Sequence, residues 1–155
     1  MLLLIFFAAC SKKKDEPTTI EEKSKLNLLT SGKWQLTRFT HQEYDGDSIM
    51  TEDIDYIDSF SVCEKSILYS FNNDGVFDIG FDPKVCDSLA EYDFILPYGN
   101  WAFKSDSTKI DFDSSPSEDQ YWMIEELTDQ KLTIRQDHYG GILLFRSIRS
   151  FKKVK

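Results

Sequence analysis

Cysteine, histidine, proline and glycine are scarce in this chain. Its 155 residues include 3 cysteines, 4 prolines, 7 glycines and 2 histidines. So little proline and glycine excludes collagen-like and low-complexity proteins. Neither His41 nor His138 has a neighbour at metal-ligand spacing, so we expect both at the surface or at strand ends. Beyond Cys10 no apolar run approaches the ~18 residues that a membrane-spanning helix requires.

The chain also lacks the short motifs of hydrolases, metalloproteases and nucleotide-binding enzymes. The neighbours Glu125 and Glu126 would point to opposite faces of a strand, so they do not form a carboxylate pair. The acidic stretch 40–61 departs from the calcium-binding EF-hand order, because Ile49 and Met50 stand where a ligand and the turn glycine belong. We therefore expect no catalytic residue, no metal site and no cofactor.

Positive charge is in deficit, and it is unevenly spread. The net charge of −9 argues against a general nucleic-acid-binding protein. Residues 1–39 hold seven basic (Lys or Arg) and four acidic (Asp or Glu) residues. Residues 40–130 hold four basic and 22 acidic residues, and residues 131–155 hold seven basic residues and one acidic residue. The acidic body is typical of a solvated surface. A second interpretation is that the two basic ends lie near anionic lipid head groups.

Aromatic residues, in contrast, are plentiful enough to build a core. The chain has 12 Phe, 7 Tyr and 3 Trp, and 41% of its residues are hydrophobic, which fits one domain of ordinary size. A capping-box pattern from Thr19 to Glu22 predicts a short helix that ends before Gly32. Runs rich in β-branched and aromatic residues then predict eight strands: Lys33–Phe39, Lys65–Asn72, Val76–Asp82, Gly99–Lys104, Lys109–Asp113, Tyr121–Leu127, Lys131–Gln136 and Ile142–Ile148. Short turns join most of these runs and no helical pattern separates them, so the fold class is all-β and antiparallel.

The second and third of these runs form a predicted hairpin with a defined register. A three-residue loop over 73–75 places Phe71 opposite Phe77 and Tyr69 opposite Ile79. That register gathers the large apolar side chains on one face and puts Gly75 at the left-handed position such loops favour.

The first ten residues resemble the end of a bacterial lipoprotein signal peptide. An uncharged apolar run ends in Ala8-Ala9-Cys10, with small residues directly before the cysteine. The resemblance implies cleavage after residue 9, a lipid on Cys10, a flexible tether over 10–19 and a folded domain over 20–155. It implies a protein anchored to the outer membrane, on its periplasmic or its surface face; the alternative is an ordinary secretory signal. Among the partners we expect the lipid anchor, and we favour a monomer.

If the protein is exported, the two remaining cysteines, Cys63 and Cys86, can oxidise to a disulfide. In the predicted hairpin Cys63 faces position 85, next to Cys86, and an exported protein reaches an oxidising compartment. We therefore predict a Cys63–Cys86 disulfide. A redox-active pair is the alternative, but no CxxC spacing supports it.

The chain as a whole resembles the lipocalin-like domain of bacterial envelope lipoproteins. The resemblance lies in Gly32-Lys33-Trp34 after a short helix, in the Tyr69–Phe77 hairpin, and in Gly99-Asn-Trp101-Ala-Phe103 with Tyr121-Trp122. It implies an up-and-down barrel of about eight strands, in which an arginine of the last strand, here Arg146, covers Trp34. It also implies that the first connection, residues 40–61, forms a lid over the open mouth.

Six aromatic residues are the candidates for the barrel interior: Trp34, Phe71, Phe77, Trp101, Phe103 and Trp122. They either fill the barrel or line a pocket for a small apolar ligand. Two functions follow: a membrane-anchored, non-enzymatic protein that binds a small hydrophobic or amphipathic ligand, or a solid structural protein whose acidic loops contact another envelope component.

Overall fold

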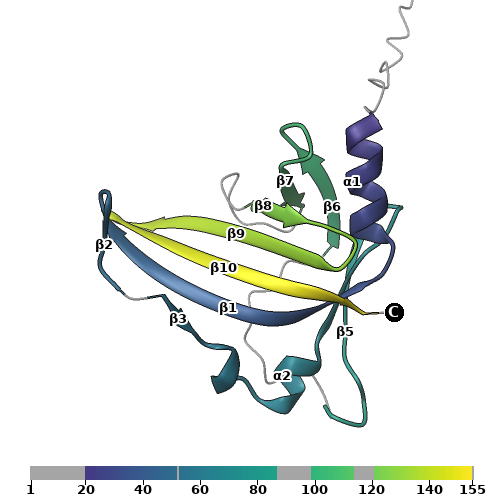
Figure 1. Ribbon diagram of the computed structural model, residues 1–155, viewed down its shortest axis with the longest axis horizontal. Helices are drawn as coiled ribbons and strands as arrows, with labels where there is room; N and C mark the ends of the chain where they lie inside the picture. Colours follow the sequence, from purple (N-terminus) through teal and green to yellow (C-terminus); the bar gives the residue numbers. More distant parts are fainter. Residues whose placement is uncertain (1–19, 52, 87–98, 114–120, 155) are drawn as a thin grey trace, which may run out of the picture.

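The computed structural model describes residues 20–51, 53–86, 99–113 and 121–154. Figure 1 shows its helices and strands. In chain order they are α1 (Ile20–Thr30), β1 (Lys33–Asp45), β2 (Ser48–Ile49), β3 (Ile54–Asp55), η1 (Ile57–Ser59), α2 (Val62–Ser66), β4 (Leu68–Phe71), β5 (Val76–Gly80), β6 (Gly99–Lys104), β7 (Lys109–Phe112), β8 (Trp122–Leu127), β9 (Lys131–Gly140) and β10 (Leu143–Val154).

Eight of the described strands close into an antiparallel up-and-down barrel. β4 to β10 pair in sequence order, and β1 joins β4 on one side and β10 on the other. The closing seam runs from Lys33 opposite Val154 to Asp45 opposite Leu143. Where all eight described strands pair around the ring, closure removes the sheet edges that aromatic strands would otherwise expose. The predicted fold class is therefore confirmed, including the short helix before the barrel.

Three strands continue beyond the part that all eight enclose. β1 pairs with β4 only from Lys33 to Gln35, and β9 loses its partner β8 beyond Arg135. Residues 39–45 of β1, 136–140 of β9 and 143–149 of β10 thus form a three-stranded extension, which Figure 1 shows reaching to the left. The chain after β1 turns back and runs along this extension. The Tyr56 amide there donates a hydrogen bond to the Phe39 carbonyl at 2.8 Å. The predicted lid segment thus starts as strand, and part of it lies along the edge of β1.

A β-bulge decides which residues of β1 face inward. The pairing of β1 with β10 shifts between Leu36 and Arg38. One extra residue reverses the alternation of side chains. Phe39 therefore lies on the same face as Leu36, whereas Arg38 points outward and pairs with Asp53 at 2.9 Å.

The predicted hairpin is confirmed in its register and its turn. Phe71 is opposite Phe77 and Tyr69 is opposite Ile79, and Gly75 adopts a φ of +85°. Cys63 and Cys86 form the predicted disulfide, although Cys63 lies in α2 rather than in a strand. The strand expected from Lys65 begins at Leu68 because Ser61 and Glu64 form a capping box that starts a helical turn.

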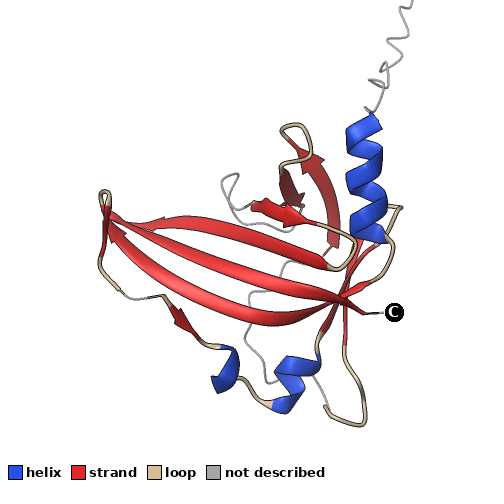
Figure 2. Ribbon diagram, viewed as in Figure 1, coloured by secondary structure: helices blue, strands red, loops and turns tan. Residues whose placement is uncertain are grey.

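The helix α1 covers one end of the barrel, as Figure 2 shows in blue. It contacts β4 and β8, strands that are not neighbours in the ring. Leu29 of α1 is fully buried, and its carbonyl accepts a hydrogen bond from Trp34 Nε1 at 2.8 Å. Among the described residues no helix is both long and apolar enough to cross a membrane.

Candidate functional site

The part of the barrel enclosed by all eight strands is filled with aromatic rings. Phe77 lies with its ring centroid 4.9 Å from that of Phe71 and 5.1 Å from that of Phe112, and Trp122 lies 4.9 Å from Phe112. Among the six interior candidates, Phe103 packs against the core while partly exposed, and the other five are buried within it: Trp34, Phe71, Phe77, Trp101 and Trp122. The structure thus brings the predicted set together, and its role in ligand binding stays a prediction.

The predicted pair of Trp34 and Arg146 is wrong, and a lysine takes the place of the arginine. Antiparallel closure puts the start of β1 against the end of β10, so Trp34 faces Lys153 and Arg146 faces Gln42. The Lys153 ammonium lies 4.7 Å from the Trp34 ring centroid and donates to the Leu28 carbonyl at 2.7 Å. Desolvation by burial lowers the pKa of Lys153.

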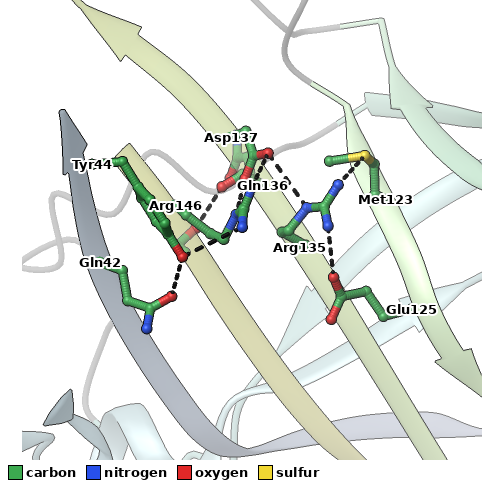
Figure 3. A network of polar contacts seen from close by, with 9 residues as sticks. Gln42, Tyr44, Met123, Glu125, Arg135, Gln136, Asp137 and Arg146 are labelled. Carbon is green, nitrogen blue, oxygen red and sulfur yellow. Dashed lines mark hydrogen bonds and ion pairs between the residues drawn. The ribbon is translucent and has the colours of Figure 1, made fainter. Parts of the chain in front are cut away.

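Arg146 belongs instead to a polar network on the outer face of the barrel (Figure 3). Its guanidinium donates twice to the Asp137 carboxylate, at 2.9 and 3.1 Å, and lies 4.9 Å from the Tyr44 ring centroid. The hydrogen bond from Asp137 raises the pKa of Arg146. Arg135 continues the network to Glu125 at 3.0 Å. Each cation here has a carboxylate partner, so the charges of this network are balanced, although Arg135 Nε is buried without a hydrogen bond.

The inner face of the three-stranded extension carries a different set of side chains. Alternation along a strand places residues two apart on one face, so positions in step with the buried Ile134 and Phe151 face inward. The inward-facing residues are Phe39, His41 and Glu43 of β1, Gln136 and His138 of β9, and Phe145, Ser147 and Arg149 of β10. Exposure along β9 rises from buried Ile134 through half-buried Gln136 to exposed His138. Solvent therefore reaches this face from its outer end.

Arg149 is the charged group deepest within this face. Its guanidinium carbon lies 5.2 Å from the Phe39 ring centroid and 5.7 Å from that of Trp122, and Nη1 donates to Gln136 Oε1 at 3.1 Å. Desolvation by burial lowers the pKa of Arg149, yet the side chain keeps part of its surface exposed to solvent. Within the described part of the chain, no carboxylate lies at ion-pair distance from it.

Tyr69 is a neighbour whose pKa is affected by the charge of Arg149. The phenol is buried, and desolvation raises its pKa to about 12, while the positive charge of Arg149 acts in the opposite direction. Tyr69 packs edge-on against Phe151, with ring centroids 5.2 Å apart. At neutral pH the group beside Arg149 is thus an uncharged phenol and offers no counter-charge.

Both histidines lie on the same inner face, on either side of one ring. His41 and His138 stack on Phe145, with centroids 5.8 and 5.1 Å away and interplanar angles of 21° and 15°. The Phe145 ring lies over Gly140, where a Cβ atom would come within 2.6 Å of it. Sequence analysis placed both histidines at the surface or at strand ends, and it did not predict that they stack on the same ring.

The remaining sequence predictions concern metals and the lipid anchor. Among the described residues no three His, Cys, Asp or Glu side chains are grouped to hold a metal ion. Cys10, the predicted lipidation site, lies outside the described residues, as do the signal segment and most of the tether.

Comparison with known protein families bears on this architecture. The family of the lipocalin-like domain matches residues 30–134, which is more than half of the chain. The chain belongs to the lipocalin-like domain family. The family match and the closed barrel agree on the fold, and a lipocalin-like barrel is compatible with the binding of a small hydrophobic ligand. No curated protein matches the chain.

The family match ends before the last strand of this lipocalin-like barrel. Lys153 and Arg149 both lie beyond residue 134, so their positions follow from the structure. Sequence analysis missed both because it ended the last strand at Ile148. The segment offered little signal, because of the inward-facing residues Ser147, Arg149, Phe151 and Lys153 only Phe151 is apolar.

Proposed function

We propose that this protein is a non-enzymatic binding protein that holds one small amphipathic molecule on the inner face of the three-stranded extension. The family supports the proposal, because lipocalin-like proteins are typically binding proteins rather than enzymes. The observation that carries it is the half-buried polar lining around Arg149, next to a core that aromatic rings fill. A barrel built only to be rigid gains nothing from a desolvated charge in its interior.

The location of the site differs from the one that the aromatic residues alone suggest. Trp34, Phe71 and Phe77 are packed against other buried residues, so they act as the floor of the site. The partly exposed rings of Phe39 and Phe145 provide its apolar surface.

Native mass spectrometry of protein purified from its own cells tests this function. We expect a population that carries one bound small molecule, which denaturing conditions release. Protein with the mass of the bare chain alone, purified without detergent or organic solvent, contradicts the proposal. That result favours the second candidate, a structural protein, for which the aromatic filling of the barrel is the supporting observation.

We further propose that Cys10 carries a lipid that anchors the barrel to the outer membrane of the cell envelope. The support is the run Ala8-Ala9-Cys10 after an apolar segment. In detergent phase separation the full-length protein is expected in the detergent phase and a Cys10→Ala variant in the aqueous phase. Equal partitioning of the two proteins contradicts the anchor.

A further inference from the structure

We propose that the ligand is an amphiphile with a single carboxylate head group, and that Arg149 binds this head group. The inference rests on the proposed function and names the chemistry of its ligand. It is derived from the charges, hydrogen bonds and ring contacts of the inner face.

Arg149 differs from the other arginines in its charge balance. Arg149 is partly buried, and among the described residues its neighbours on the inner face are two aromatic rings, an amide and a phenol, with no carboxylate to balance its charge. The other arginines of the described chain, Arg38, Arg135 and Arg146, each pair with an aspartate or glutamate. A buried charge is costly unless it is paired. An anion that enters from the solvent-exposed end supplies the missing partner.

The hydrogen-bond donors of Arg149 are a second observation. A guanidinium carries five N–H groups, and Arg149 uses Nη1 on Gln136. Among the described residues no other hydrogen-bond acceptor engages it. The planar fork of N–H groups matches the two oxygens of a carboxylate. Gln136 fixes the orientation of the fork, because its amide oxygen holds one edge.

The aromatic rings on this face are a third observation. Phe39 flanks the guanidinium at 5.2 Å, and Phe145 lies on the same face four residues away along β10, with both residues partly exposed. Two partly exposed rings on the same face as a cation suit a molecule with one anionic end and an apolar body. The inward-facing groups that titrate are Tyr69 beside Arg149 and, further along the face, His41, His138 and Glu43. Glu43 is opposite Phe145, four residues from Arg149 along β10.

Three probes of equal chain length test the head group: decanoate, decanol and decyltrimethylammonium, each titrated into the wild-type protein by isothermal calorimetry. We expect one decanoate per barrel, bound about 10- to 100-fold more tightly than decanol, which is the range of one charge-assisted hydrogen-bonded contact. Decyltrimethylammonium is expected to bind more weakly than decanol.

The variants Arg149→Gln and Arg146→Gln form a matched pair, since both residues are partly buried arginines of β10 but point to opposite faces. Arg149→Gln is expected to remove the preference for decanoate over decanol. Arg146→Gln is expected to keep the preference. A preference that survives in Arg149→Gln, or is lost in Arg146→Gln, overturns the assignment.

A measurement on the wild-type protein covers the case in which Arg149→Gln does not fold. The carboxyl carbon of 13C-labelled decanoate reports its ionisation by NMR, and a guanidinium partner lowers the pKa of the bound carboxyl below that of free decanoate. An unchanged or raised pKa overturns the proposal. If decanol binds as tightly as decanoate, the head-group assignment is wrong and the proposed function still stands. If none of the three probes binds, the proposed function is wrong as well.

Discussion

Lys153 lies over the face of Trp34 and ties the last strand to the helix. Its ammonium is 4.7 Å from the ring centroid, and it donates to the Leu28 carbonyl at 2.7 Å and to Ser31 Oγ at 2.8 Å. One side chain thus joins β10, β1 and the segment after α1, at the end of the barrel that the helix covers.

Loss of this cation is expected to destabilise the barrel. Lys153→Met removes the cation–π contact and both hydrogen bonds, and we predict a loss of about 1–3 kcal/mol in the free energy of unfolding. Urea denaturation measures it. Lys152→Met is the control, because Lys152 is exposed and points to the other face. Equal midpoints for the two variants would show that the contact contributes nothing.

The disulfide is expected to stabilise the fold by holding α2 to the end of the β4–β5 hairpin. Cys63 and Cys86 are 23 residues apart, and loop closure over that distance contributes about 3 kcal/mol. The double variant Cys63→Ala/Cys86→Ala should therefore unfold at a lower urea concentration than the oxidised wild type. Reduced wild type should match the double variant, and a midpoint that reduction leaves unchanged argues against a stabilising bond.

Tyr69 makes the stability of the protein sensitive to alkaline pH. Its folded-state pKa is raised to about 12 from the ordinary value of 10.0, so the unfolded chain releases this proton first. The free energy of unfolding therefore falls as the pH rises from about 10 to about 12, and two pKa units correspond to about 3 kcal/mol. Ultraviolet titration should show one tyrosine that ionises later than the rest, and Tyr69→Phe should abolish that late step. The same late step in Tyr69→Phe would assign it to another residue.

Gly140 is needed because the Phe145 ring occupies the space of a side chain. Gly140→Ala places a methyl group 2.6 Å from that ring, and we predict a loss of about 1–2 kcal/mol together with a changed environment of His138 in NMR spectra. Gly80→Ala is the control, since a Cβ there meets nothing within 4 Å. If both variants are equally stable and the His138 resonances stay in place, the ring is not held where the structure has it.

Alternation and turn chemistry were enough to predict the strands from sequence. The register of Phe71 against Phe77 follows from a period of two and from one glycine, and both are local properties. The bulge after Leu36 is not local, because it depends on how β1 pairs with a strand more than a hundred residues later.

The candidate site was predicted less well for the same reason. The last predicted strand ended at Ile148, so Arg146 was its only cation. In the structure β10 continues to Val154, which moves Lys153 over Trp34 and puts Arg149 inside. Pairing with β1 sets the length of β10, and neither charge nor hydrophobicity within 142–155 reveals that partner.

A crystal structure of the protein with decanoate would locate the ligand and its head group in one measurement. We expect difference density for one decanoate on the inner face of the extension, with a carboxylate oxygen within about 3 Å of an Arg149 Nη atom. We also expect the alkyl chain to contact Phe39 or Phe145. Density for the ligand among Phe71, Phe77 and Trp122 instead, or on the outer face beside Arg146, would contradict the proposal.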